Sequence, residues 1–410
     1  MKAVIFTLGC KVNSKESLSI KSGLLSKGYE VSEKLEYADL YVINTCAVTA
    51  EAEKKSRQAI ARVKKYNQNA TIYVVGCASQ KNPKVFIERG AKVVMGTKSK
   101  DKLLSHLNDS GIFIEQDDKY YEEFLPCKSH HTREYIKIQD GCDNYCAYCI
   151  IPYLRGSSRS RKIENIVKEI EFLNPAEAVI TGINVSAFDD EGKKLPDLIQ
   201  SLTHLNCRVR FGSLEVGVID ENLMQSLKKL KCFAPHFHLS LQSGSDNVLR
   251  AMNRKYTTAE YLEKVKLIRS YFPDAGITTD IIVGYSAETD QDFNDCLSFC
   301  DKVEFSDIHC FPYSVREGTE GAKLKPIDDQ IKKQRLNQMM QKKAKLKSEF
   351  ISKNLNSTQL FIAEEFEDGY TVGYTGNYIR VYIKGEFLGP SALVKLVSCF
   401  RDGALCEVVK

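Results

Sequence analysis

Three cysteines occur within eight residues in the stretch GCDNYCAYCII at 141–151, with the spacing C-x3-C-x2-C. Cys142, Cys146 and Cys149 can place three thiolates on one side of a cubane iron–sulfur cluster, which leaves one iron open to a small molecule. A zinc ribbon normally supplies paired C-x2-C units, and the sequence offers no second such pair. The spacing therefore favours a cluster with an open iron over zinc or over three unrelated buried thiols.

A second set of three cysteines lies at the ends of predicted strands near the N-terminus. Cys10, Cys46 and Cys77 follow the strand-like runs at 3–9, 39–45 and 71–76, a further strand is predicted at 92–96, and helix-like runs separate them at 14–28 and 50–66. This alternation predicts an open parallel α/β sheet, whose strands all end at one edge. We expect the three cysteines to meet there as ligands of a second cluster, with ordinary buried thiols as the alternative.

The middle of the chain repeats a strand–helix unit six times. The predicted strands span 134–139, 177–185, 208–215, 236–243, 276–285 and 305–313. Six such units in series predict a partial (β/α)6 barrel, with its site at the carboxyl ends of the strands. The C-x3-C-x2-C stretch falls in the first strand-to-helix loop, at this mouth.

The last part of the chain changes character. A basic helix is predicted at 329–353, followed by five short alternating strands separated by turn residues, a pattern typical of a small all-β, OB-like barrel. The α/β chain is thus predicted to contain three domains, 1–125, 126–348 and 349–410.

Composition narrows the class of protein. The 410 residues include 14 cysteines, and 58 basic residues against 53 acidic ones give a net charge of only +5. No apolar run approaches the length of a bilayer span, and the N-terminal run lacks a secretory cleavage site. We predict a cytoplasmic protein with no membrane association, whose other eight cysteines are structural thiols.

The cysteine loop, with Tyr148 as the aromatic residue before Cys149, resembles that of the radical S-adenosylmethionine (SAM) enzymes. The resemblance implies that SAM chelates the open iron and that the reduced cluster cleaves it to a 5′-deoxyadenosyl radical. Similar enzymes carry a proline in the loop that here reads GYSAET, so this loop is expected to be less rigid. The matching motifs imply SAM contacts for Tyr148, Gly182, Asn184, Glu215, Gln242, Ser243 and Gly284.

The motifs TLGCKVN, INTCAVT and VVGCASQ around the first three cysteines resemble the N-terminal domain of methylthiotransferases. The C-terminal strands resemble the RNA-associated TRAM barrel of that family, so the resemblance covers nearly the whole chain. It implies two 4Fe-4S clusters and two uses of SAM. One SAM methylates a sulfur held by the N-terminal cluster, and the second activates an inert C–H bond, for which acid–base side chains do not suffice.

The same motifs look most like the branch that acts on N6-threonylcarbamoyladenosine at position 37 of tRNA. Isopentenyladenosine of tRNA, an aspartate of a ribosomal protein, and a non-enzymatic iron–sulfur RNA-binding protein remain the alternatives. The implied partners are tRNA, an electron donor such as flavodoxin or ferredoxin, and a sulfur source.

Several polar residues outside these motifs suggest contacts with RNA. Arg155, Arg159 and Arg161 follow the cysteine loop and are predicted to meet phosphates, unless they form a merely solvated basic loop. Tyrosines of the terminal barrel are candidates for base stacking. His236 and His238 share one face of a strand, and packing or hydrogen bonding is expected of them rather than catalysis.

Overall fold

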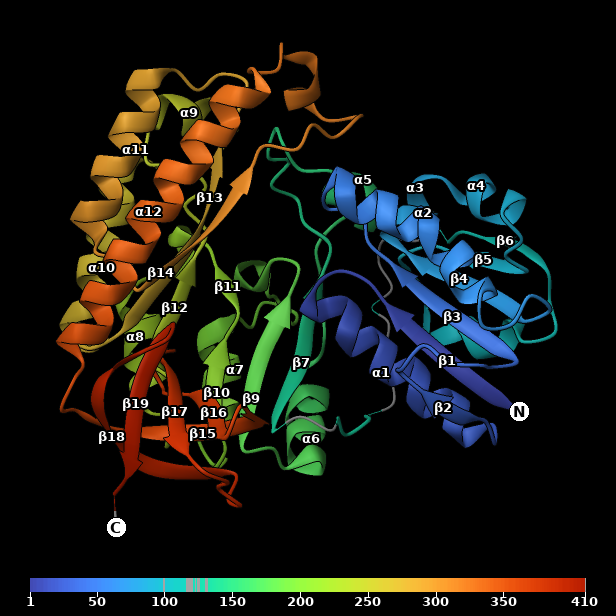
Figure 1. Ribbon diagram of the computed structural model, residues 1–410, viewed down its shortest axis with the longest axis horizontal. Helices are drawn as coiled ribbons and strands as arrows, with labels where there is room; N and C mark the ends of the chain where they lie inside the picture. The colour runs from blue at the N-terminus through green and yellow to red at the C-terminus, as the bar shows by residue number, and fades with distance from the viewer. Residues whose placement is uncertain (99, 116–120, 122, 124–125, 130–131, 410) are drawn as a thin grey trace.

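The computed structural model describes residues 1–98, 100–115, 121, 123, 126–129 and 132–409. They form three sheet-based units in chain order, with the N-terminal sheet on one side of the central barrel and the terminal barrel packed at its base (Figure 1). The predicted fold class is confirmed. The predicted boundary at 125 falls among residues outside the described ones.

The N-terminal unit is a six-stranded parallel sheet of order β2-β1-β3-β4-β5-β6. Four of these strands were expected, whereas β2 and β6 are three-residue edge strands too short for a periodic signal. Helices cover both faces. The strands are β1 (Lys2–Thr7), β2 (Glu30–Ser32), β3 (Leu40–Thr45), β4 (Thr71–Gly76), β5 (Val93–Met95) and β6 (Gly111–Phe113). The helices are α1 (Lys11–Ser26), α2 (Ala50–Lys64), α3 (Cys77–Lys81), α4 (Pro83–Glu88) and the 3-10 helix η1 (Lys100–His106).

The central unit contains the six predicted parallel strands, arranged as a partial barrel. Its third strand divides at Gly212 into β10 and β11, which belong to two adjoining sheets of order β10-β9-β7-β8 and β11-β12-β13-β14. Only β8 runs antiparallel to its neighbour. The strands are β7 (Arg133–Asp140), β8 (Arg159–Ser160), β9 (Glu177–Gly182), β10 (Arg208–Phe211), β11 (Ser213–Leu214), β12 (His236–Leu239), β13 (Gly276–Val283) and β14 (Asp307–Pro312).

The outer layer of this barrel consists of helices that bury one apolar face. In α6, Ile163, Ile166 and Ile170 recur at helical spacing and enter the core that the strands share. The helices are α5 (Ile151–Arg155), α6 (Ile163–Leu173), α7 (Leu195–Leu202), α8 (Glu221–Lys228), α9 (Asp246–Ala251), α10 (Thr258–Tyr271) and α11 (Asp290–Val303), with the 3-10 turns η2 (Val185–Ala187), η3 (Val216–Val218) and η4 (Glu320–Lys323).

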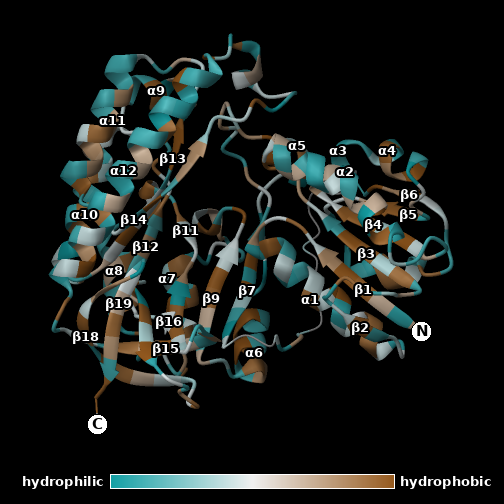
Figure 2. Cartoon of the chain, viewed as in Figure 1, coloured by the Kyte–Doolittle hydropathy of each residue, from teal (hydrophilic) through white to brown (hydrophobic). Residues whose placement is uncertain are grey.

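The basic helix is α12 (Asp329–Lys353), with the predicted bounds, and its N-terminus is capped by the Asp328 side chain. Figure 2 shows α12 as largely hydrophilic beside the more hydrophobic strands. Much of its charge is neutralised within the chain, because Lys342 pairs with Asp301 and Lys343 with Asp307. This helix therefore offers less free charge to RNA than its sequence suggests.

The chain ends in a closed five-stranded barrel of order β15-β16-β17-β19-β18, as predicted. Arg208 and Arg210 of β10 donate hydrogen bonds to backbone carbonyls of this barrel and fix it to the central unit. No helix in the described part of the chain has the length and apolar character needed to cross a membrane. The barrel strands are β15 (Thr358–Glu367), β16 (Tyr370–Tyr374), β17 (Arg380–Lys384), β18 (Ser391–Phe400) and β19 (Gly403–Val408).

Candidate active site

A cavity of about 600 Å³ separates the carboxyl ends of two groups of parallel strands. On one side lie Cys10, Cys46 and Cys77, which follow β1, β3 and β4. On the other side lie Gly182 and Gly212, at the ends of β9 and β10. The prediction that three cysteines far apart in sequence meet at one sheet edge is confirmed.

The thiols of this first triad suit a cluster better than a single ion. Burial, followed by the neighbouring thiols Cys77 and Cys10, raises the pKa of Cys46 to about 11, so thiolates here need a cationic ligand. Among the described residues, the only set of potential metal ligands whose atoms all lie within 4.8 Å is elsewhere in the cavity. Zinc would hold thiolates about 3.8 Å apart. At least one pair of the triad thiols is therefore more than 4.8 Å apart, which is wider than a zinc ion would hold them and fits a larger cluster better.

Gly9 packs directly against Cys46 of this triad, and its backbone has a left-handed conformation at φ +107°. A Cβ atom added at Gly9 would lie 2.7 Å from Cys46 Cβ and 2.9 Å from Cys46 Sγ. No side chain larger than hydrogen fits there without moving a cysteine.

We expect Gly9→Ala to lower the iron content of the reconstituted protein by displacing Cys46. Gly28→Ala is a matched control, because Gly28 also has a positive φ but its added Cβ meets nothing within 4 Å. Both variants should lose about 1–2 kcal/mol of stability from backbone strain. Iron and sulfide assays that show equal iron in the two variants would contradict a role for Gly9 at the triad.

The second triad, Cys142, Cys146 and Cys149, occupies the loop between β7 and α5. Its thiols accept hydrogen bonds from two other loops, since Arg254 Nη1 donates to Cys146 Sγ at 3.3 Å and Asn184 Nδ2 to Cys142 Sγ at 3.8 Å. Burial, followed by the charges of the two other thiols, raises the pKa of Cys149 to about 12. As in the first triad, ionised thiols here require a positive ligand.

Three of the seven residues expected to contact SAM lie beside the second triad or line the large cavity. Asn184 and Glu215 lie beside the second triad, where Glu215 accepts hydrogen bonds from Asn144 at 2.7 Å and Arg254 at 3.2 Å. Gly182 lines the large cavity.

The remaining four sit deeper in the packed wall. Tyr148 is packed against a small apolar cluster, and Ser243 is 1% exposed. Gln242 has a left-handed backbone at φ +72° and bonds to β13. Gly284 packs so closely on α12 that an added Cβ would lie 2.3 Å from Lys332. Their contact with SAM stays a prediction.

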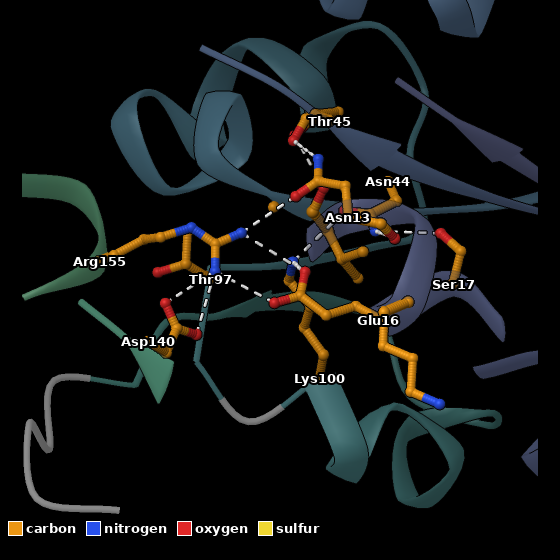
Figure 3. Close-up of polar contacts among 12 residues, drawn as sticks. Asn13, Glu16, Ser17, Asn44, Thr45, Thr97, Lys100, Asp140 and Arg155 are labelled. Carbon is orange, nitrogen blue, oxygen red and sulfur yellow. Dashed lines mark hydrogen bonds and ion pairs between the residues drawn. The ribbon is translucent and has the colours of Figure 1, made fainter. Parts of the chain in front are cut away.

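A buried polar network joins the two domains beneath the cysteines (Figure 3). Arg155 donates to Asp140 at 2.9 and 3.0 Å, to Glu16 at 3.1 Å and to Asn13 at 3.0 Å. Asn13 in turn donates to the carbonyls of Leu8 and Thr45, which precede Cys10 and Cys46. The network therefore fixes the loops of the first triad to the segment that follows the second.

These contacts contradict the prediction that Arg155, Arg159 and Arg161 bind phosphate. All three are buried, at 1%, 6% and 7% exposure. Arg159 pairs with Asp140, and Arg161 pairs with Glu169 and Glu123. The basic run looks exposed in the sequence because its acidic partners come from distant elements.

An aromatic wall reaches the cavity from the terminal barrel. Tyr378, with a left-handed backbone at φ +73°, lines the cavity and stacks on His236 with ring centroids 4.4 Å apart and on Tyr374 at 4.6 Å. Arg210 lies over its ring, 4.8 Å from the centroid. The terminal barrel thus contributes a side chain to the cavity itself.

Two further features of the site depend on contacts that the sequence does not show. His238 and His309 both contact Asp280, at 3.3 and 3.2 Å, and form the compact ligand-like group noted above. Arg254, in the loop after α9, bridges Cys146 and Glu215. His238 was expected only to pack or to form hydrogen bonds, and no motif pointed to His309 or Arg254, because their roles depend on residues of other elements.

Comparisons with known proteins agree with this geometry. Residues 2–96 match the uncharacterized protein family UPF0004, and residues 136–300 match the radical SAM superfamily. The structure is also similar to the radical SAM methyltransferase TsrM from Kitasatospora setae, at TM-score 0.55 and 12% identity, covering 76% of this chain and 72% of that one. This likeness concerns the fold.

Full-length relatives are closer. The chain is 33% identical to the threonylcarbamoyladenosine tRNA methylthiotransferase MtaB of Bacillus subtilis, covering 100% of this chain and 98% of the relative, and 35% identical to MtaB of Aquifex aeolicus, covering 93% and 100%. It is 33% identical to a tRNA-2-methylthio-N(6)-dimethylallyladenosine synthase of Alkaliphilus oremlandii, covering 100% and 93%. The chain therefore belongs to the radical SAM tRNA methylthiotransferase family.

Proposed function

We propose that this protein transfers a methylthio group to C2 of N6-threonylcarbamoyladenosine at position 37 of tRNA in the cytosol. The observation that carries the proposal is the placement of two cysteine triads from two domains: the first lines the cavity together with Gly182, and the second accepts a hydrogen bond from Asn184, two residues further along the same loop. When bound, the clusters and SAM supply sulfur delivery and the radical activation of an inert C–H bond.

The residues of this chain hold and separate these groups. Cys142, Cys146 and Cys149 would bind the cluster that cleaves SAM, with Asn184 and Arg254 donating to its thiolates. Donors to thiolates stabilise their charge and orient them.

The other triad, Cys10, Cys46 and Cys77, would bind the cluster that carries sulfur at the cavity wall. A reducing protein such as flavodoxin or ferredoxin and a sulfur source complete the requirements.

The lining of the cavity favours the threonylcarbamoyl substrate over the dimethylallyl one. Relatives with either name are about equally similar to the chain. The cavity wall opposite the cysteines includes the charged and polar side chains of Arg210, His236, His238 and Asp280. A dimethylallyl group offers no hydrogen-bonding atom to His236 Nδ1, which has no partner among the described residues, and leaving that nitrogen buried and unpaired costs about 1–3 kcal/mol.

The test is an anaerobic reaction of reduced, reconstituted protein with SAM and tRNA that carries N6-threonylcarbamoyladenosine. We expect 5′-deoxyadenosine together with the 2-methylthio nucleoside, both measured by mass spectrometry. Parallel reactions with isopentenylated tRNA and with ribosomal proteins should give no methylthio product. A product only in one of those two reactions would transfer the function to that substrate, and no SAM cleavage at all would favour a structural iron–sulfur protein.

A further inference from the structure

One positive charge at the cavity has no protein counter-ion in the described part of the chain. Lys11, the first residue of α1, lines the cavity, and its ammonium group forms no hydrogen bond or ion pair there. Its nearest described interaction is with the ring of Tyr135, 5.8 Å from the centroid. The other cationic side chains of the lining are held by carboxylates: Arg133 by Glu364, Arg155 by Glu16 and Asp140, and Arg210 by Glu177.

The acidic side of the cavity does not balance this charge. Asp280 is the only carboxylate among the described lining residues, and both of its oxygens are occupied by imidazoles, through His238 and His309. Asp280 is also not the counter-ion of Lys11, because the ammonium nitrogen of Lys11 does not lie within 4.0 Å of an Asp280 carboxylate oxygen. A ligand with a negative charge would therefore be favoured over a neutral one at Lys11.

A second unused polar group faces the same cavity. His236 is 6% exposed, and its Nε2 contacts Thr278 Oγ1 at 2.8 Å, while its buried Nδ1 has no hydrogen-bond partner among the described residues. Burial lowers the pKa of His236 well below its usual value, and the nearby charges of Arg210 and Lys11 lower it further. The imidazole is therefore neutral, with one nitrogen left for a ligand.

We propose that Lys11 is a specificity-determining residue, whose ammonium group pairs with the threonyl carboxylate of the substrate while His236 Nδ1 bonds to a polar atom of the same substituent. This inference rests on the proposed function. The threonylcarbamoyl group carries one carboxylate and several hydrogen-bonding atoms, which match the charge and the orphaned nitrogen. A dimethylallyl group offers neither. Because Lys11 directly follows Cys10, the substituent would be recognised beside the first triad.

The test uses tRNA anticodon stem-loops that differ only at residue 37, which carries N6-threonylcarbamoyladenosine, its carboxylate methyl ester, or unmodified adenosine. The wild-type protein is expected to bind the free carboxylate about tenfold more tightly than the ester, as a charged hydrogen bond predicts. Lys11→Gln should reduce this ratio to within about twofold. The charge-conserving Lys11→Arg should retain most of it. Binding of the unmodified stem-loop should be the same in all three proteins.

The outcomes separate this inference from the proposed function. Iron content and the visible spectrum of Lys11→Gln must equal those of the wild type, which shows that the neighbouring cluster is intact. If the wild type forms the methylthio product but Lys11→Gln still distinguishes carboxylate from ester, the assignment of Lys11 is overturned alone. If the wild type neither distinguishes the two nor modifies the threonylcarbamoyl RNA, both are overturned.

Discussion

Replacing Cys77 by alanine is expected to lower the iron content of the reconstituted protein from about eight to about four atoms per chain. The substitution removes one of three thiolates at the cavity wall, where Cys77 is 3% exposed and adjoins Cys46 and Cys10. A cubane held by two thiolates is not expected to persist. Methylthio transfer should then be lost entirely, while SAM is still cleaved to 5′-deoxyadenosine, because the second triad lies in a different loop.

The matched control is Cys406→Ala in the terminal barrel. Cys406 is 4% exposed, so its loss leaves a similar small cavity in a similar environment but removes no triad thiol. Iron and product formation should be those of the wild type. Eight irons in Cys77→Ala, or loss of SAM cleavage together with transfer, would contradict two independent sites.

Replacing Arg155 by methionine is expected to lower the free energy of unfolding by about 3–5 kcal/mol. Arg155 is 1% exposed and donates to two buried carboxylates, Glu16 from the N-terminal unit and Asp140 from the central one. Removing the guanidinium leaves both carboxylates desolvated with fewer partners. The two units should therefore separate at lower urea concentration, as followed by circular dichroism of the cluster-loaded protein.

Arg57→Met provides the comparison for this variant. Arg57 also forms an ion pair with a glutamate, but its side chain is 38% exposed, so its loss should cost less than about 1 kcal/mol. Equal stability of the two variants would show that the buried network does not hold the units together. Arg155→Met is also expected to lower iron at the first triad, because Arg155 positions Asn13 and through it the loops of Cys10 and Cys46.

The cysteines were predictable from sequence because their positions follow a general rule of topology. Parallel strands end at one edge, so Cys46 and Cys77, each directly after a strand, had to lie on neighbouring loops. The C-x3-C-x2-C spacing of the second triad was by itself a signal for a cluster with an open iron. Both triads could therefore be predicted from local patterns in one sequence.

The arginines show where this reasoning stops. The run from Arg155 to Arg161 has the composition of a basic loop, but Arg155 pairs with a glutamate 139 positions away. That pairing requires α1 to pack against the central barrel, beside which it lies in Figure 1. Lys11 is the opposite case. It was visible as one letter of a motif, but its lack of a counter-ion becomes apparent only once every neighbour is placed.

Tyr378 separates cofactor assembly from substrate binding. This tyrosine closes part of the cavity wall, yet it lies in a different domain from both cysteine triads. A polypeptide without residues 349–410 keeps all six triad cysteines but has lost this side of the cavity. Loading with iron and modification of the substrate are therefore expected to come apart in such a truncated protein.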